Sequence, residues 1–284
     1  MTWPIRWDLL TRYRLIEIIA QWEGRLISNH LMDSFGIGRQ QASKDINSYL
    51  TDIAPGNLVY DKKSRGYTPS PQFSPKVSAG SADEYLHALA RIKHIQHTFE
   101  TLDLGFANTE MLQLPLRQIS PLIIRPVVQA ARENRWLEIA YASISSERVV
   151  KRFIVPHTLV CTPLRWHLRA YCKEREKFLD FVLTRFRDVP TIGEKSQKTA
   201  EDDTLWQTEV CIRLEPNSRL TEMQRDIVQH DFAMVDGRLE LKTRAALASY
   251  LLHALNINTQ GVLDNPLLQQ VVVANREEIQ EYLF

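Results

Sequence analysis

The chain has 284 residues, of which 44% are hydrophobic and 24% are charged, and both fractions are typical of a folded globular protein. Its length allows two or three small domains, and its apolar runs are far shorter than the ~20 residues that a membrane-spanning helix needs. The N-terminus lacks the apolar core of a signal peptide, so we expect a soluble, cytoplasmic protein without a membrane segment.

Three segments of the chain differ in charge, although the net charge is only +1. Residues 1–75 carry nine Lys/Arg and seven Asp/Glu, residues 135–190 carry eleven and six, and residues 201–284 carry seven and fourteen. The basic middle segment suits an anionic ligand, whereas the acidic segment is poorly suited to nucleic acid. The three cysteines form no Cys-x-x-Cys pair, and we expect neither a metal site nor a cofactor.

Two polar stretches, residues 68–82 and 190–204, have the composition of linkers. They predict an N-terminal unit at 1–75, a linker and helical connector at 76–134, a β-rich unit at 135–190 and an α/β extension at 201–284.

The N-terminal unit has the pattern of a winged helix-turn-helix domain. Apolar residues recur at three- and four-residue spacing from Leu9 to Ala20 and again after Gly38, which indicates two helices with one buried face each. A shorter helix between them ends at Phe35, before a glycine-containing turn. Residues 58–60 and 67–68 predict a hairpin around a basic turn.

Polar side chains of the third helix and of the hairpin turn are candidates for DNA contacts. Arg can bond guanine through two hydrogen bonds in the major groove, and Gln or Asn can do the same with adenine. Lys and Ser suit phosphate oxygens, which position a protein without reading sequence. A solvated helix on a small bundle without DNA function is the alternative. The candidates are Arg39, Gln40, Gln41, Ser43, Lys44 and Asn47 on the helix and Lys62, Lys63 and Arg65 on the turn.

The rest of the chain changes from helical to strand periodicity near Trp136. A capping box at Ser81 predicts a helix that runs to about Leu102, and another helix is predicted at 121–134. The predicted strands are 136–143, 148–155, 164–172 and 178–187. The extension is predicted to contain strands near 206–214, 238–244 and 269–274 and helices at 217–231, 245–255 and 275–283.

One predicted strand places four polar side chains on the same face, namely Arg165, His167, Arg169 and Tyr171. Such a face suits an anion, because the planar guanidinium of Arg donates two parallel hydrogen bonds to a phosphate. Neighbouring strands could add Arg152 and Arg185, and Tyr141 and Ser143 could add hydroxyl donors. A charged strand face that simply meets water is the alternative.

Four segments of this unit resemble the WYL domain: Tyr141-Ala-Ser143, Arg152-Phe-Ile-Val-Pro-His157-Thr-Leu159, Arg165-Trp-His-Leu-Arg-Ala-Tyr171 and Phe181-Val-Leu-Thr-Arg185-Phe. The chain has Trp166-His167-Leu168 where the family has Trp-Tyr-Leu. The resemblance covers essentially the whole chain and implies an α+β multidomain fold. That fold comprises a winged helix-turn-helix, a helical linker, an Sm- or SH3-like β-barrel and a C-terminal α/β dimerisation extension.

The resemblance further implies a homodimeric transcriptional regulator, usually a repressor, that binds an inverted repeat in double-stranded DNA. The chain is most similar to regulators of the BrxR and CapW type, which accompany the phage-defence systems BREX and CBASS. It also implies that the barrel senses an anionic ligand such as a nucleotide or a nucleic-acid fragment. The residues that match the ligand site are Tyr141, Ser143, Arg152, His157, His167, Arg169 and Arg185.

Two other functions remain open at this point. The barrel could hold single-stranded nucleic acid as an accessory subunit of a nucleic-acid-processing enzyme, or the acidic extension could bind another protein as an adaptor. The chain contains no nucleophile elbow, no His-Glu-x-x-His motif and no P-loop, so we do not expect it to be an enzyme itself.

Overall fold

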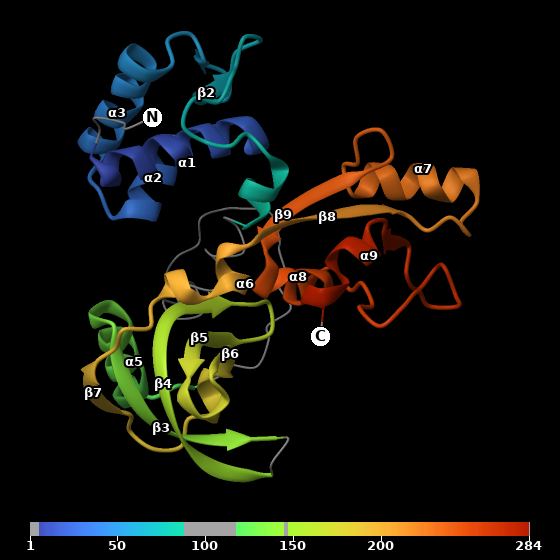
Figure 1. Cartoon of the computed structure of the whole chain (residues 1–284). Helices are drawn as coiled ribbons and strands as arrows, with labels where there is room; N and C mark the ends of the chain where they lie inside the picture. The colour runs from blue at the N-terminus through green and yellow to red at the C-terminus, as the bar shows by residue number, and fades with distance from the viewer. Residues whose placement is uncertain (1–5, 88–117, 145–146, 284) are drawn as a thin grey trace. The chain divides into compact units, whose positions relative to one another are not determined.

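The structure is a computed structural model that describes residues 6–87, 118–144 and 147–283 (Figure 1). The chain separates into two compact units, residues 1–113 and 114–284. Residues 82–87 are helical, as predicted, and the remainder of that predicted helix lies outside the described residues.

The first unit has the predicted order of three helices and a hairpin (Figure 1). Helix α2 ends where Gly36 adopts a left-handed conformation with φ 61°, which glycine tolerates without strain. Helix α3 continues into a short π-helical turn. The elements are α1 (Trp7–Glu23), α2 (Ser28–Phe35), α3 (Arg39–Ser48), the turn at Tyr49–Ile53, β1 (Leu58–Asp61) and β2 (Gly66–Pro69).

A buried carboxylate attaches the segment after the hairpin to α1. Both carboxylate oxygens of Glu17, which is fully buried, accept hydrogen bonds. One oxygen accepts from the Tyr49 hydroxyl at 2.9 Å and from the Lys76 N–H at 2.7 Å. The other accepts from the N–H groups of Val77 and Ser78 and from the Ser78 hydroxyl, at 2.7–2.9 Å. Part of the predicted first linker therefore belongs to the fold of this unit.

The second unit begins with a helix that packs against a five-stranded antiparallel sheet of order β6-β5-β4-β3-β7. The sheet closes on itself because Phe186, beyond β6, forms a bridge to Tyr141 of β3, and the Arg187 N–H donates to the Ala140 carbonyl at 2.9 Å. The elements are α5 (Pro121–Glu133), β3 (Arg135–Ser143), β4 (Arg148–Cys161), β5 (Trp166–Cys172), β6 (Lys177–Val182) and β7 (Thr191–Lys195).

Three strands of this barrel differ from the prediction, and one of them, β6, ends at Val182, five residues before the predicted end, because Leu183–Arg185 form a 3-10 turn. Strand β4 runs on to Cys161, six residues past the predicted end, and tolerates Pro156 because the register shifts between Pro156 and Thr158. Strand β7 lies in the stretch 190–204, for which the expectation of a plain linker is wrong. Three of its five residues are polar, which suits its place at an edge of the sheet beside β3, and Ile192 packs against the barrel core.

The extension forms a three-stranded sheet of order β10-β8-β9 with helices packed on it. Its helix α7 starts five residues after the predicted position, because Thr221 and Gln224 form a reciprocal capping box there. The elements are α6 (Thr204–Gln207), β8 (Glu209–Pro216), α7 (Glu222–Asp231), β9 (Leu239–Arg244), α8 (Ala248–Ala254), β10 (Val271–Val273) and α9 (Arg276–Ile279).

Candidate nucleic-acid interface and ligand site

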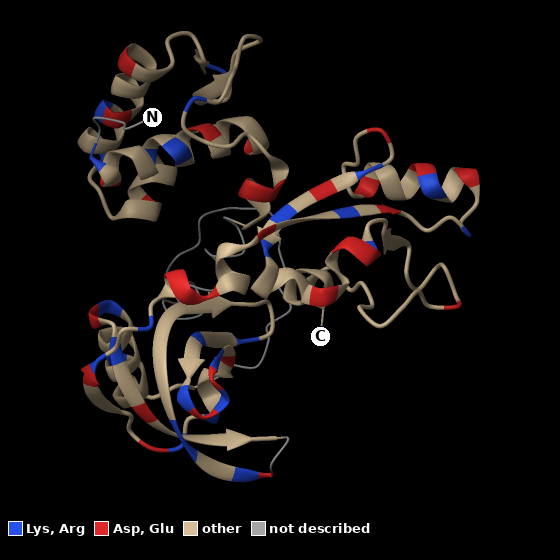
Figure 2. Cartoon of the chain, in the orientation of Figure 1, with Lys and Arg blue, Asp and Glu red and all other residues tan. Residues whose placement is uncertain are grey.

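The candidate DNA-binding side chains all lie on the surface of the first unit. Helix α3 buries Ala42 and Ile46 in the core and turns its other face outward. The six predicted residues of α3 and the three of the hairpin turn are all exposed. Figure 2 shows the Lys and Arg residues of the chain in blue. The first turn of α3, where Arg39 begins the helix after Gly38, therefore offers long polar side chains to a groove.

One of these side chains is held in place by a buried acid. The Gln41 amide nitrogen donates to Asp45 Oδ1 at 2.7 Å, one helical turn further on. Asp45 is only 2% exposed, and its Oδ2 lies 2.7 Å from Arg12 Nε of α1 in an ion pair. The orientation of Gln41 is thus coupled to the packing of α1 on α3.

The side chain of Asp61 stabilises the turn of the hairpin. The Asp61 carboxylate accepts from the N–H groups of Lys63 at 2.9 Å and Ser64 at 3.1 Å. The nearby Ser64 side chain and the hydrogen bonds from the N–H groups of Lys63 and Ser64 hold the pKa of Asp61 below its ordinary value. The turn that carries the exposed Lys62, Lys63 and Arg65 is therefore held by these hydrogen bonds, and its basic side chains suit phosphate oxygens.

In the barrel, two predicted ligand residues meet around a carboxylate of the protein itself. Arg169 is 4% exposed and forms two hydrogen bonds with Asp203, at 2.7 Å and 3.0 Å, and one with Asp180 at 3.3 Å. His157 is the extra residue at the register shift of β4, and its Nε2 lies 3.2 Å from Asp203 Oδ2. The charge of Arg169 is therefore already balanced inside the fold.

This cluster shifts the pKa values of its members. Burial favours the neutral form of Asp203, but the hydrogen bonds and charge of Arg169 outweigh it, so the pKa of Asp203 lies below its ordinary value. Burial lowers the pKa of His157, although the hydrogen bond and charge of Asp203 oppose this. The arrangement is a buried Asp–Arg ion pair beside a histidine that is neutral at pH 7.

A second group of side chains, His167 and Tyr250, adjoins this cluster through Asp180. His167 is 3% exposed, and its ring centroid lies 4.9 Å from that of Tyr250 on α8, whose hydroxyl donates to Asp180 at 3.1 Å. Burial lowers the pKa of His167, Asp180 opposes this, and the charges of Arg165 and Arg185 reinforce it. Within the part of the chain that the structure describes, Nδ1 of His167 has no hydrogen-bonding partner.

The remaining predicted ligand residues lie elsewhere on the barrel. Tyr141 packs in its core, where its hydroxyl accepts from the Val182 N–H at 3.0 Å. Arg152 pairs opposite Ile139, and its charge acts on the Cys172 thiol. Ser143 lies at the end of β3, opposite Arg148. The structure thus groups His157 with Arg169 around Asp203, whereas Arg185 reaches His167 only through the effect of its charge.

Two members of the predicted cationic face of β5, His167 and Arg169, are therefore covered, whereas Arg165 and Tyr171 remain partly exposed. Asp203, the N-cap of α6, and Tyr250 of α8 both come from the extension side of the unit and contact this face. Sequence reasoning missed both residues. An Asp-Thr pair ahead of Leu205-Trp206 is an N-cap signal that would have predicted α6, but not its partner on β5.

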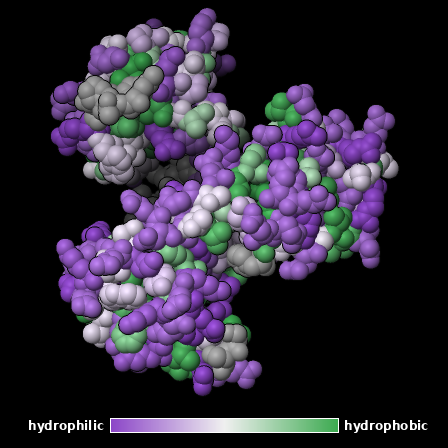
Figure 3. Space-filling view, viewed as in Figure 1, coloured by the Kyte–Doolittle hydropathy of each residue, from purple (hydrophilic) through white to green (hydrophobic). Residues whose placement is uncertain are grey.

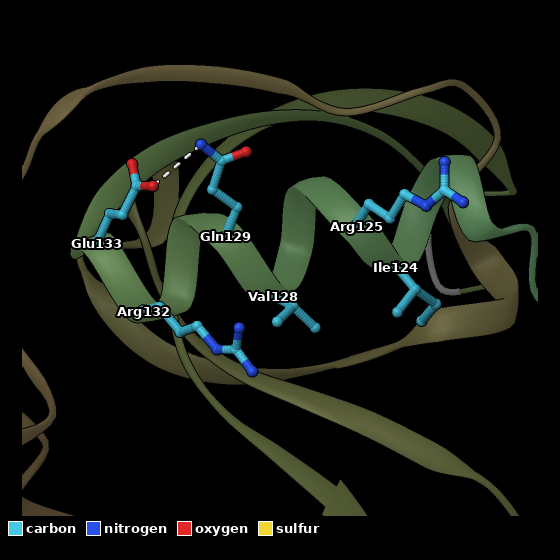
Figure 4. A pocket seen from close by; sticks show the side chains of 6 residues that line it. All are labelled: Ile124, Arg125, Val128, Gln129, Arg132 and Glu133. Atoms are coloured by element: carbon cyan, nitrogen blue, oxygen red, sulfur yellow. Dashed lines mark hydrogen bonds between the residues drawn. The ribbon is translucent and has the colours of Figure 1, made fainter.

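A hollow with a volume of about 440 Å³ lies along α5 (Figure 4). It contains no predicted ligand residue. Across the described residues, no three His, Cys, Asp or Glu side chains are placed to hold a metal ion, and no helix has the length and hydropathy needed to cross a membrane. The residues that line the hollow are Ile124, Arg125, Val128, Gln129, Arg132 and Glu133.

We expect the second unit to lose stability as the pH falls from 7.5 to 5.5. The pKa values of His157 and His167 in the fold lie below 6.5, so below that pH the unfolded chain binds protons before the folded chain does. Their contribution is complete above about pH 6.5 and is lost as the pH falls through the folded pKa values. Thermal unfolding at the two pH values measures the effect, and the double variant His157→Gln/His167→Gln should reduce it. Equal pH dependence of the variant and the unmodified chain would contradict this account.

Three family models match the chain in the order of the observed parts. The BrxR transcriptional regulator winged helix-turn-helix domain matches residues 8–91, the WYL domain residues 123–191, and the BrxR transcriptional regulator C-terminal dimerization domain residues 209–279.

Curated relatives match over nearly the full length. Proteins named DNA-binding transcriptional repressor CapW are 32% identical in Pseudomonas aeruginosa and in Stenotrophomonas maltophilia, in each case over 98% of this chain and 93% of the relative. The protein of that name from Escherichia coli strain KTE188 is 33% identical over 96% of this chain and 91% of the relative. These relatives are named as regulators and not as enzymes. The chain therefore belongs to the BrxR/CapW family of WYL-domain transcriptional regulators.

Proposed function

We propose that the chain is a sequence-specific DNA-binding transcriptional repressor that acts in the bacterial cytoplasm and inserts α3 into the major groove. The observation that carries this proposal is the exposed polar face of α3, which lies opposite buried Ala42 and Ile46 and is accompanied by a basic hairpin turn. Relatives named as DNA-binding repressors support it.

The same proposal includes a homodimer that binds an inverted repeat. The match to a C-terminal dimerization domain supports the dimer. That part of the chain also exposes apolar side chains, among them Met223 and Ile227 one turn apart on α7, which are 76% and 50% exposed. Figure 3 shows hydrophobic residues in green on one face of the molecule. Two recognition helices related by a twofold axis would enter successive major grooves about 34 Å apart.

We further propose that an anionic ligand bound near His167, Arg165 and Arg185 modulates DNA binding. Two guanidinium groups and a buried imidazole with an unpaired nitrogen suit a phosphate group of a nucleotide or a nucleic-acid fragment. The contact of His167 with Tyr250 connects this group to the extension. A coupling free energy of about 1–3 kcal/mol between ligand binding and DNA binding would change the affinity for DNA by about 5- to 150-fold. By resemblance to its family, the regulated operon is one for phage defence.

Replacing Arg39 and Lys44 separately by alanine should weaken DNA binding in two distinguishable ways. Arg39→Ala should reduce the preference for the operator over scrambled DNA, because it removes a base contact. Lys44→Ala should weaken binding to both DNAs alike and lower the salt slope by about one, because it removes a phosphate contact. Fluorescence anisotropy at several salt concentrations measures both effects. Unchanged affinity of both variants would place the DNA interface elsewhere.

Arg185→Ala should spare operator affinity and abolish the response to the ligand. Nucleotides and short oligonucleotides serve as probes in a competition experiment with labelled operator DNA. The exposed neighbour Arg187 supplies the matched control, and Arg187→Ala should respond like the unmodified chain. A normal response of Arg185→Ala would show that this arginine is not part of the ligand site.

A further inference from the structure

The geometry points to a further restriction on what α3 reads: Asp45 fixes the side-chain amide of Gln41 and thereby limits this position to bases with an amino group in the major groove. The inference rests on the proposed function, because it assumes that α3 contacts base edges. It concerns the base class that one residue selects, and Asp45 acts in it as a positioning residue.

The fixed contact is between the Gln41 amide nitrogen and Asp45 Oδ1, at 2.7 Å. A side-chain amide presents a carbonyl oxygen, which accepts, and an NH₂ group, which donates. A carboxylate only accepts, so the NH₂ group must face Asp45 and the carbonyl oxygen must be directed away from it. Without this contact, the amide could rotate by half a turn about its last bond and offer either group to DNA.

Asp45 is itself immobilised by the core of the domain. It is 2% exposed, and the guanidinium of Arg12, whose side chain is 12% exposed, holds its other oxygen. Arg12 belongs to α1, and its position is further supported by Asp8 at 3.5 Å. A ligand on the outer surface of α3 can therefore not easily turn Asp45 aside, and the orientation of Gln41 is set before DNA arrives.

The edges of the bases then decide which nucleotide fits. In the major groove, adenine and cytosine present amino groups that donate hydrogen bonds, whereas guanine and thymine present oxygen acceptors at the corresponding places. An outward carbonyl oxygen on Gln41 pairs with an amino group and repels an acceptor. Gln41 should therefore select adenine or cytosine and reject guanine and thymine.

Selection of binding sites from random double-stranded DNA by the full-length protein tests this inference. We expect a motif in which one position per half-site accepts adenine or cytosine, with guanine or thymine there weakening binding about tenfold. Gln41→Met, which keeps the length of this exposed side chain and removes its polar atoms, should make that one position degenerate and leave the others unchanged.

Asp45→Asn is the decisive variant, because Arg12 only donates hydrogen bonds and therefore keeps the asparagine oxygen, which leaves the asparagine NH₂ group facing Gln41. The Gln41 carbonyl oxygen should then face residue 45 and its NH₂ group should face DNA, so we expect the same position to prefer guanine or thymine, while the rest of the motif persists. Asp52→Asn, an acid-to-amide change at an exposed site after α3, should leave the whole motif unchanged. Thermal unfolding checks that Asp45→Asn folds.

If Asp45→Asn does not fold, Gln41→Glu replaces it. Its side chain has acceptors only, so the position should still require adenine or cytosine at reduced affinity. Three results would overturn the inference: a motif that Gln41→Met leaves intact, a Gln41-dependent position that prefers guanine or thymine, or an unaltered restriction in folded Asp45→Asn. The absence of any motif for the unmodified protein would instead contradict the proposed function.

Discussion

Replacing Arg169 by alanine should destabilise the second unit by about 3–5 kcal/mol, because it leaves the buried carboxylate of Asp203 without its cation and removes a partner of the partly buried Asp180. The side chains of Arg169 and Asp203 are 5% and 2% exposed, so water cannot replace the lost contacts. Hydrogen exchange of the amides in residues 200–207 should accelerate, since Asp203 anchors this segment to β5. Thermal unfolding and hydrogen exchange together measure the effect.

An exposed ion pair in the same unit supplies the control. Arg238 pairs with Glu215, with side chains 61% and 33% exposed, and Arg238→Ala should change the free energy of unfolding by about 1 kcal/mol or less. Asp203→Ala should reproduce much of the Arg169→Ala effect, and the double variant should be less destabilised than the sum of the two. Strict additivity would mean that the ion pair does not couple α6 to the barrel.

Glu17→Ala should destabilise the first unit by about 3 kcal/mol or more, because it leaves several buried donors without an acceptor. These donors are the Tyr49 hydroxyl, the Ser78 hydroxyl and three consecutive N–H groups that begin at Lys76. The same three amides should lose their protection from hydrogen exchange, which locates the effect at the segment that follows the hairpin.

A milder substitution and a surface control distinguish this loss from a general change of charge. Glu17→Gln keeps the shape and one acceptor oxygen, so it should be less harmful than Glu17→Ala. Asp33→Asn changes an exposed acid on α2 and should leave the amides of residues 76–78 protected. Unchanged exchange of these amides in Glu17→Ala would contradict the role assigned to this carboxylate.

The sequence predicted the elements of the DNA-binding unit because each has a local signal. The spacing of apolar residues marks α1 and α3, and Gly36 marks the end of α2. Exposure of the candidate side chains of α3 followed from the same period, since residues opposite Ala42 and Ile46 must face outward. That Glu17 binds residues 76–78 could not be predicted, because the contact joins positions about 60 residues apart.

The cationic face of β5 shows what the periodicity of a strand cannot predict. Alternation correctly placed His167 and Arg169 on one side of β5, opposite Leu168. It could not show that Asp203 and Tyr250 cover this side, because both come from parts of the chain distant in sequence. Strand β7 was missed because an edge strand with polar residues has the composition of a linker.

The central claim is that the protein reads DNA sequence, and one binding experiment tests it most directly. Fluorescence anisotropy compares the full-length protein on DNA from upstream of its own operon with scrambled DNA, at several salt concentrations. The account predicts a preference for the upstream DNA of at least about 10³-fold at physiological salt, together with a steep salt dependence. Equal, weak binding to both DNAs, with no motif recovered by selection from random DNA, would contradict it and favour a barrel that binds single-stranded nucleic acid.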